Sequence, residues 1–272
     1  MDGLDRSTIA SGIRLPGLEV RLVQRCTSTN AVLMADVKER PERAAAHPVL
    51  LAAEEQTAGR GQGGRSWRSA PGAGVTFSIL RRMRCTPRDL AGLSLVVGVA
   101  AARALHSLGA TNVALKWPND LLAGGGEKDA KLGGILIETR VQGGEVAAVV
   151  GIGINCRPVR TLGMQLRRGL TSLDDLVQPA PARNAVICAV AREVLAALGD
   201  FERAGLPAFA AAWRSLHAHE GRRLRVRLAG GRTVSGIAEG LAAGGALRLR
   251  TARGTREISS GRIISARGAG GA

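Results

Sequence analysis

Lysine is scarce in this chain of 272 residues. Four of its 38 basic residues are lysines, namely Lys38, Lys116, Lys128 and Lys131, and the remainder are arginines. An ammonium is a compact charge on a flexible stem that can follow a phosphate or carboxylate during a reaction, whereas a guanidinium is a rigid fork. Lys116 and Lys131 lie in otherwise apolar or strand-like segments, so they are candidates for catalysis. Each could also be an ordinary half-exposed strand lysine.

Aromatic side chains are also rare, at 2 % of the sequence, while the formal net charge is +16. An excess of positive charge favours an acidic partner, including nucleic acid. Proteins that bind single strands stack the bases on aromatic rings, and the arginines here are scattered, with no aromatic platform among them. A general enrichment in arginine therefore explains the charge better than a nucleic-acid-binding module does, and no direct DNA binding is expected.

Cysteine pairs and long apolar runs are absent as well. The four cysteines are widely separated with no CxxC pair, and the four histidines show no ligand spacing apart from His217-x-His219. This pattern predicts free thiols in a reducing compartment, without disulfides or a protein-held structural metal. The apolar run Leu90–Ala102 is shorter than the roughly 20 residues that span a bilayer, and the acidic segment Met1–Arg6 does not resemble a secretory signal. We expect a cytoplasmic protein with no membrane contact.

The order of the apolar segments predicts a mixed α and β fold. Alternating or continuously apolar runs indicate strands, and apolar residues at helical spacing indicate helices. The expected strands are Leu18–Val23, Val49–Ala53, Val75–Leu80, Val113–Trp117, Leu132–Thr139 and Val146–Ile154. The last two are expected to pair across a turn at 142–144. The expected helices begin near Ala31 and cover Leu90–Leu108, Ala185–Glu202 and Pro207–Leu216.

The pattern changes in the last fifth of the chain. From Arg222 to Ile264, short strands alternate with glycine turns at 230–231, 244–245 and 254. Short strands at this spacing are typical of a small β barrel of SH3-like size. We therefore predict two domains, a larger one at 1–218 and a barrel at 219–272.

A glycine-rich loop at 57–74 follows the second expected strand. Its run Gly59-Arg60-Gly61-Gln62-Gly63-Gly64 formally matches the dinucleotide-binding pattern GxGxxG, but no amphipathic helix follows, and the region about twenty residues on is basic. The chain also has no Walker GxxxxGK[ST] motif. The loop carries Arg60, Arg65 and Arg68, whose guanidinium groups, together with backbone N–H groups, could surround a phosphate or carboxylate. A merely flexible loop is the alternative.

Five motifs occur in one order along the chain. They are Ser28-Thr29-Asn30, Glu55-Gln56-Thr57-Ala58-Gly59-Arg60-Gly61 leading to Trp67, Lys116-Trp117-Pro118-Asn119-Asp120, Lys131-Leu132-Gly133-Gly134-Ile135, and Gly151-Ile152-Gly153-Ile154-Asn155. Each motif alone is weak, but the set resembles the biotin–protein ligases over about Glu19 to Ile264. The resemblance implies an α+β fold with a mixed, largely antiparallel sheet and packed helices, similar to class II synthetases, followed by an SH3-like barrel.

The resemblance also implies a two-step, ATP-dependent reaction. The biotin carboxylate attacks the α-phosphate of ATP to give biotinyl-AMP, and a lysine of a biotin carboxyl carrier protein, or of the carrier domain of a biotin-dependent carboxylase such as acetyl-CoA carboxylase, then attacks this mixed anhydride. The implied small molecules are biotin, ATP and Mg²⁺. Joining two anions requires cations that screen their repulsion and stabilise the charge that develops on phosphorus.

The family's functional residues can be placed on this sequence by motif. Lys131 and Arg60 would be catalytic, with Mg²⁺ bound alongside ATP near Asp120. The biotin-binding residues would be Ser28, Thr29, Asn30, Gln56, Gly59, Arg60, Gly61, Gln62, Lys131, Gly133 and Gly134. The ATP-binding residues would be Arg65, Trp67, Lys116, Asn119, Asp120 and Asn155. Ser28 and Thr29 could instead act only as helix caps, and Trp67 could simply anchor its loop.

The sequence departs from the family in two places. Many members carry arginine at the positions of Gln62 and Gly63, so retention of the intermediate would depend on fewer charges here. Some members also have an N-terminal winged-helix DNA-binding domain. Only about twenty residues precede the first expected strand here, so direct repression of DNA is not expected. A lipoate or octanoate ligase of the same fold and a basic nucleic-acid-binding regulator remain the alternatives. The oligomeric state is open between monomer and homodimer.

Overall fold

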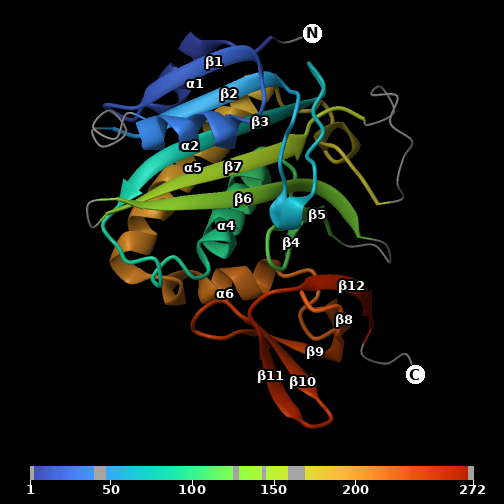
Figure 1. The fold of residues 1–272 in the computed structure, drawn as a ribbon. Helices are drawn as coiled ribbons and strands as arrows, with labels where there is room; N and C mark the ends of the chain where they lie inside the picture. The colour runs from blue at the N-terminus through green and yellow to red at the C-terminus, as the bar shows by residue number, and fades with distance from the viewer. Residues whose placement is uncertain (1–2, 40–46, 125–128, 143–144, 159–168, 269–272) are drawn as a thin grey trace.

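The computed structural model describes residues 3–39, 47–124, 129–142, 145–158 and 169–268 (Figure 1). A seven-stranded sheet dominates the larger part of the chain. The elements of this part are α1 (Arg6–Ile13), β1 (Glu19–Cys26), α2 (Thr29–Glu39), β2 (Val49–Gln56), η1 (Gln62–Gly64), β3 (Gly74–Met83), α4 (Leu93–Ser107), β4 (Val113–Lys116), β5 (Asp120–Ala123), β6 (Ala130–Gln142), β7 (Glu145–Asn155), η3 (Leu173–Asp175), α5 (Arg183–Ala204) and α6 (Pro207–Leu216).

The large sheet is mixed and mostly antiparallel, as the resemblance implied. Its strand order is β1-β2-β3-β7-β6-β5-β4. Only β1 and β2 run parallel, and the other neighbouring pairs of this sheet are antiparallel. The expected pairing of the strands around 132–139 and 146–154 is confirmed by the β6–β7 register. The tip of their turn, at 143–144, lies outside the described residues.

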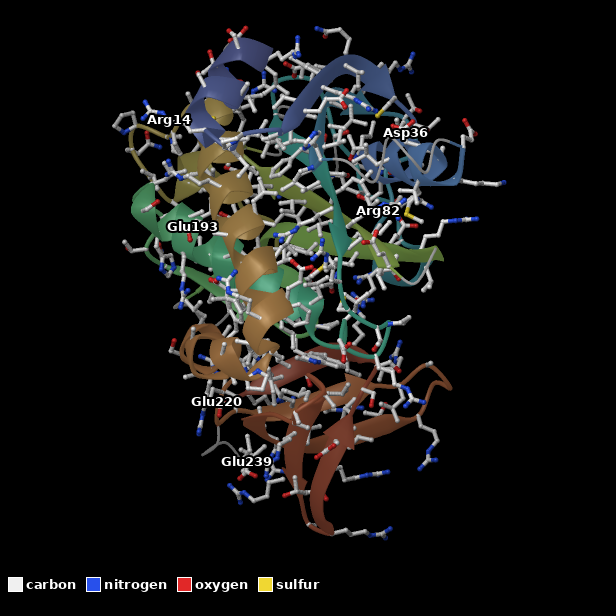
Figure 2. The ribbon with its side chains drawn as sticks, turned by 90° about the vertical axis from the view of Figure 1, so that its left-hand side faces the viewer. Arg14, Asp36, Arg82, Glu193, Glu220 and Glu239 are labelled. Atoms are coloured by element: carbon white, nitrogen blue, oxygen red, sulfur yellow. The ribbon has the colours of Figure 1, made fainter. Side chains whose placement is uncertain are left out.

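Helices cover the two faces of this sheet unequally. The helices α1, α4 and α5 pack on one face over the main apolar core, and in Figure 2 α5 runs along the front of that layer. The single helix α2 lies on the other face, where Leu33 and Val37 pack against side chains of β2, β3 and β7. Because α2 covers only part of its face, the rest of that face is free to form a pocket.

Strand alternation gives the two faces different chemistry. Successive side chains of a strand point to opposite faces, so Phe77 and Ile79 enter the main core while Thr76 and Ser78 turn toward α2. On the neighbouring strand β7, Gly153 pairs with Thr76 and Gly151 pairs with Ser78, so two glycines lie beside two hydroxyls. The α2 face therefore has a polar, shallow patch at the centre of the sheet.

A buried ion pair joins α5 to the sheet behind this patch. Arg183 is 1 % exposed, and its guanidinium donates to both carboxylate oxygens of Glu54, at 2.7 and 3.0 Å. Burial by itself raises the pKa of Glu54, but hydrogen bonds from Arg183 and from the Leu4 N–H outweigh it and leave the pKa below its usual value. Glu54 immediately precedes the motif residues Glu55 and Gln56, so this pair fixes the end of β2.

The C-terminal part forms a second, smaller sheet. Its strands are β8 (Arg223–Arg227), β9 (Thr233–Leu241), β10 (Leu247–Thr251), β11 (Gly254–Ile258) and β12 (Arg262–Arg267), in the order β11-β10-β9-β8-β12 with antiparallel pairing throughout. Hydrogen bonds tie it to the large unit: the Trp117 indole Nε1 donates to Gly245 O at 3.1 Å, and His219 Nε2 lies 2.7 Å from the Asp129 carboxylate.

The expected elements are present, with two additions. Helix α1 was not expected, although Asp5 caps it by accepting a hydrogen bond from the Thr8 N–H at 2.7 Å. Strand β5 was also not expected, because Pro118 suggested that the chain leaves the sheet after Trp117. The chain instead turns back at once, so that Asp120 pairs with Lys116. Among the described residues, no helix combines the length and apolar character needed to cross a bilayer.

Candidate functional site

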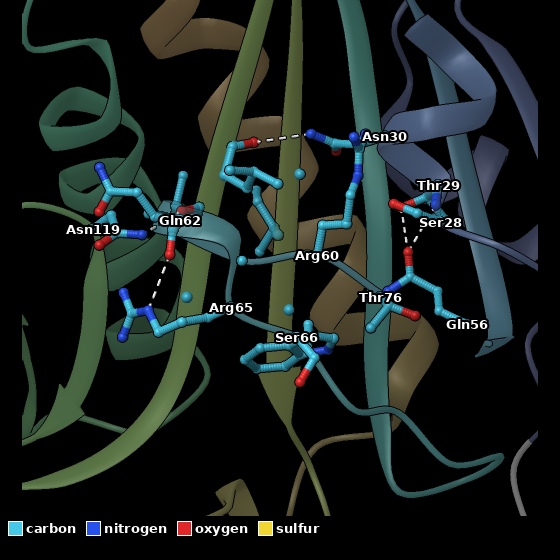
Figure 3. A pocket seen from close by; sticks show the side chains of 18 of the residues that line it. Ser28, Thr29, Asn30, Gln56, Arg60, Gln62, Arg65, Ser66, Thr76 and Asn119 are labelled. Atoms are coloured by element: carbon cyan, nitrogen blue, oxygen red, sulfur yellow. Dashed lines mark hydrogen bonds between the residues drawn. The ribbon is translucent and has the colours of Figure 1, made fainter. Parts of the chain in front are cut away.

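A pocket opens on the α2 face of the large sheet (Figure 3). The first turn of α2, the end of β2, the glycine-rich loop and the strands β3, β6 and β7 contribute to it. The predicted site residues that line it are Ser28, Thr29, Asn30, Gln56, Arg60, Gly61, Gln62, Arg65, Trp67, Asn119, Lys131 and Gly134. Four of the five motifs are thus brought to one cavity by predicted residues, and the fifth contributes Gly151 and Gly153.

One end of the pocket is a hydrogen-bonded network of buried polar side chains. Gln56 Oε1 accepts from the Thr29 backbone N–H at 2.7 Å, and Thr29 Oγ1 lies 2.6 Å from Ser78 Oγ. Ser78 Oγ in turn donates to Asn30 Oδ1 at 2.6 Å. Ser28 occupies the position before α2, with its Oγ at 3.5 Å from the Ala31 N–H. Since this contact is long, helix capping alone does not account for a serine at position 28.

Asn30 rests on the bare backbone of β7. A Cβ at position 151 would overlap the Asn30 carboxamide, so only glycine leaves room for it. The Asn30 Nδ2 group donates to Leu136 O at 3.2 Å and to the Glu138 carboxylate at 2.9 Å. With Ser78 donating to Oδ1, every contact of this amide specifies its orientation. The Asn30 amide is therefore fixed in one orientation.

The glycine-rich loop folds over the pocket as a narrow hairpin. Gly61 N–H donates to Arg65 O at 2.6 Å, and Trp67 N–H donates to Gly59 O at 2.8 Å. Gly63 and Gly64 have φ of 68° and 74°, which explains why glycine suits the tip. Arg60 reaches across the opening, and its Nη2 lies 2.8 Å from Glu138 Oε2. The loop is thus closed against β6 by an ion pair.

Trp67 lies flat against β7 at the floor of the pocket. A Cβ at Gly153 would overlap the indole ring, so the glycine provides the seat for this aromatic side chain. The indole Nε1 is buried and has no hydrogen-bond partner among the described residues. A buried donor without a partner is costly, so a ligand atom that accepts from it would be favoured.

Lys131 stands at the other end of the pocket. Its Nζ is 2.5 Å from Asp120 Oδ1, and Gly134 leaves room for the ammonium. Asn119 is 8 % exposed, and its Nδ2 donates to Ile135 O at 2.7 Å. Asn155 donates to Thr171 O at 3.0 Å, which anchors the strand end below Lys131. The unexpected strand β5 is what brings Asp120 to Lys131.

Lys116 lies outside this cavity, in a second polar cluster. Its Nζ is 4.0 Å from Asp129, which also accepts from the buried His219 Nε2 at 2.7 Å. Burial lowers the pKa of Lys116 from its usual value, with Asp129 and Asp120 opposing the shift. Burial likewise lowers the pKa of His219, with Asp129 opposing the shift. The cluster joins the start of the small sheet to β4.

Gly59, Gly133, Asp120 and Asn155 do not line the cavity, but they shape it. A Cβ at Gly59 would overlap Trp67 O, and a Cβ at Gly133 would lie 2.6 Å from Gly153 O, so both positions require close approach of backbones. Sequence reasoning missed Ser78 and assigned no role to Glu138. The signals were a hydroxyl inside the apolar run 75–80 and a carboxylate at the end of the apolar run 132–137.

Comparison with known proteins agrees with this geometry. Residues 22–155 match the biotin/lipoate A/B protein ligase family, and residues 219–264 match the biotin protein ligase C-terminal domain. The chain is 36 % identical to the biotin–[acetyl-CoA-carboxylase] ligase of Mycobacterium tuberculosis, over 92 % of this chain and 90 % of that protein. It is 35 % identical to the bifunctional ligase/repressor BirA of Escherichia coli, over 87 % of this chain and 70 % of that protein.

A solved structure supports the same relationship. The biotin protein ligase from Aquifex aeolicus in complex with biotin and ATP superposes with a TM-score of 0.71 at 27 % identity, covering 92 % of this chain and 98 % of that one. The fold and the pocket define an ATP-dependent ligase that modifies proteins. Within that class, the chain belongs to the biotin protein ligases of the biotin/lipoate A/B protein ligase family.

Proposed function

We propose that this protein activates biotin with ATP and transfers it to a lysine of a biotin carboxyl carrier protein or carrier domain. In the first step a biotin carboxylate oxygen attacks the α-phosphorus, and the bond to the β-phosphate breaks to release pyrophosphate. In the second step a neutral lysine amine attacks the acyl carbon, AMP leaves, and the amine loses a proton. Carriers of this kind are suggested by the carboxylase in the name of the Mycobacterium relative.

The biotin head would occupy the end of the pocket formed by Thr29, Asn30 and Gln56. A ureido group presents both donors and acceptors, and this end offers a hydroxyl and two amides that are already fixed by their neighbours. A site built from fixed hydrogen-bonding groups discriminates strongly against a ligand that lacks the matching atoms. Ser28, Gly59, Gly61, Gln62, Gly133 and Gly134 would complete the biotin subsite by shape and backbone contacts.

The reacting groups would meet between Arg60 and Lys131. Both cations line the same cavity, one from the loop and one from the start of β6. Their positive charge would screen the repulsion between the biotin carboxylate and the α-phosphate and stabilise charge in the transition state. Asp120 would keep the Lys131 ammonium in place through the contact at 2.5 Å.

The nucleotide would extend past Asn119 with its adenine against Trp67. Arg65, Lys116 and Asn155 would hold its phosphates and ribose. Within the described residues no group of three or more His, Cys, Asp or Glu side chains is placed to hold a metal. A magnesium ion that arrives with ATP needs one or two carboxylates at most, and Asp120 fits that role. Bound there, Mg²⁺ would supply charge neutralisation at the phosphates.

The small sheet would form a separate domain at 219–272, after a catalytic domain at 1–218. This division is supported by the two strand orders and by the start of the second family match at residue 219. Trp117 bonds across the boundary to Gly245, and Asp129 bonds across it to His219, so the second domain would stiffen β4 and the lysine it carries.

The observation that carries the proposal is the convergence of Thr29, Asn30, Arg60 and Lys131 on one cavity from three separate segments, namely α2, the glycine-rich loop and β6. The test supplies purified protein with ATP, Mg²⁺, labelled biotin and an acceptor domain. Label on the acceptor and release of pyrophosphate are expected, and parallel reactions with lipoate or octanoate are expected to give little product. Efficient use of lipoate with none of biotin would reverse the assignment of substrate.

A further inference from the structure

Glu138 is the one acidic side chain that touches both the biotin end of the pocket and the loop above it, among the contacts of the described residues. Its Oε2 accepts from Asn30 Nδ2 at 2.9 Å and from Arg60 Nη2 at 2.8 Å. Asn30 belongs to α2, Arg60 to the loop and Glu138 to β6, so one carboxylate oxygen joins three segments that are far apart in sequence.

The position of Glu138 follows from strand alternation. Gly134, Leu136 and Glu138 share one face of β6, opposite Gly153, Gly151 and Val149 of β7, and this is the face on which α2 and the pocket lie. A carboxylate here is an exception beside the glycines and the leucine. Its side chain is 27 % exposed, against 45 % for Arg60, so the pair is partly shielded from water.

The hydrogen-bond directions leave little freedom in this network. A carboxylate can only accept, so Asn30 must turn its NH₂ group toward Glu138 and its carbonyl oxygen toward Ser78. Ser78 Oγ also contacts Thr29 Oγ1 at 2.6 Å. The charge on Glu138 therefore sets the orientation of Asn30, whose contacts continue through Ser78 to Thr29.

We propose that Glu138 is a positioning residue of the biotin site, which holds Arg60 closed over the pocket and fixes the donor and acceptor directions of Asn30 before biotin enters. The inference rests on the proposed function of the pocket and adds a residue to which no role was assigned. Glu138 itself does not touch the reacting atoms; it acts through Arg60 and Asn30.

The physical reason is the cost of ordering a glycine-rich loop. Each loop residue that is fixed loses backbone entropy, and glycine loses most. An ion pair made within the protein offsets part of this cost in advance, so less of the binding energy of biotin is spent on closing the loop. Without Glu138 the loop would open more often, and Asn30 would lose a partner while it remains 3 % exposed.

The test compares Glu138→Gln and Glu138→Met with the wild type. Gln keeps an acceptor for Asn30 but loses the charge, whereas Met keeps the length and loses both. We expect the Kd for biotin to rise about threefold for Gln and about tenfold for Met, since partly exposed pairs contribute modestly. The KM for ATP should stay within about twofold of the wild type, because the nucleotide end is not touched.

Limited trypsin digestion of the unliganded protein gives a second measurement that a purely structural role would not change. Cleavage after Arg60, Arg65 or Arg68 should become faster in both variants, and saturating biotin with ATP should suppress it. Glu145→Gln is the matched control, because it removes the same charge from a surface ion pair with Arg82. The control should show wild-type biotin affinity and wild-type cleavage.

The outcomes separate the two proposals. If the wild type forms no biotinyl-AMP, the proposed function fails and the inference about Glu138 fails with it. If the wild type is active and Glu138→Met binds biotin as the wild type does, Glu138 is only a surface charge. Tighter binding by Glu138→Met would also overturn the inference, because Glu138 would then compete with the ligand carboxylate for Arg60.

Discussion

Residues 1–218 and residues 219–272 carry the same net charge, although the second stretch is a quarter as long as the first. The first has 27 basic and 19 acidic residues, and the second has 11 basic and 3 acidic residues, so each has a net charge of +8. All four lysines belong to the first stretch. The two regions therefore use the same overall charge in different ways.

In the large unit, three cations in or around the pocket each contact a carboxylate. Arg183 meets Glu54 in the core, Arg60 meets Glu138 above the pocket, and Lys131 meets Asp120 inside it. The first two pairs join segments that are distant in sequence, and the third joins the consecutive strands β5 and β6. Here charge fixes geometry, and the fold depends on the partner as much as on the cation.

In the small sheet, arginines stand on the exposed face of alternating strands. Arg223 lies directly opposite Arg267, and Arg227 lies directly opposite Arg262. Like charges across a strand pair are destabilising. Within the described strands of this sheet, one ion pair is found, between Arg250 and Glu239, and Figure 2 labels Glu239 in the small sheet. This charge does not serve the stability of the sheet and is available to steer an acidic partner.

The largest expected effect is on stability, at the buried pair of the large unit. Arg183→Met should lower the free energy of unfolding by about 3–5 kcal/mol, because it leaves the Glu54 carboxylate buried without its cation. Arg203→Met, which breaks the exposed pair with Asp200 on the same helix, should cost less than about 1 kcal/mol. Urea denaturation measures both, and equal losses would show that burial of the first pair does not matter.

The same pair gives a pH dependence. Because the pKa of Glu54 is below its unfolded value of 4.5, the pair contributes stability above that value, and the contribution is lost as pH falls through the lower folded pKa. Arg183→Met should flatten this part of the pH profile.

The next effect is on catalysis. Lys131→Ala should slow adenylation about a hundredfold or more without unfolding the protein, because it removes a cation at the reacting phosphate. Lys131→Arg should also be slow, since a rigid fork cannot replace the ammonium beside Gly134. The measurement is pyrophosphate release by the folded variants. Near-normal release would show that Lys131 is not a catalytic residue.

Two glycines of β7 allow the halves of the pocket to be tested separately. Gly151→Ala should displace the Asn30 amide and raise the Kd for biotin about tenfold, with little change for ATP. Gly153→Ala should displace Trp67 and weaken ATP binding instead. Calorimetric titration with each ligand distinguishes them, and the same pattern for both variants would contradict the division of the pocket.

A smaller effect is expected where the two regions meet. His219→Leu removes the donor to Asp129 and should raise the KM for ATP about threefold through Lys116, leaving the KM for biotin unchanged. His219→Gln should restore most of the loss, because its Nε2 can donate to the same carboxylate. If neither variant changes ATP kinetics, the cluster only holds the small sheet in place.

The smallest effect concerns the exposed arginines. Raising salt from low to physiological strength should slow transfer to the acceptor by a few fold and leave biotinyl-AMP formation nearly unchanged. The double substitution Arg225→Gln with Arg227→Gln should reduce this salt dependence, whereas Arg140→Gln on the large sheet should not. Equal salt sensitivity of the two half-reactions would show that the positive charge does not steer the acceptor and only reflects the arginine-rich composition.

The sequence by itself determined the main elements and the chemistry of the pocket. The β6–β7 pair, the helices α5 and α6 and the strand-rich C-terminal region follow from the periodicity of apolar residues, which local geometry imposes. Lys131 stood out because lysine is rare in this chain and this one lies in an apolar segment, whereas Arg60 and Asn30 were assigned by the motifs that resemble the biotin–protein ligases. Asp5 and Thr8 also carried a capping signal for α1 that was overlooked.

Only the tertiary structure decided which groups meet. The chain turns back at Pro118 and forms β5, because pairing with β6 outweighs the local signal to leave the sheet. This turn brings Asp120 to Lys131. Nothing local to Glu138, Arg60 or Asn30 specifies their contact, since they are separated by up to 108 residues. Their meeting depends on strand order and on which face each side chain takes, which are properties of the assembled sheet.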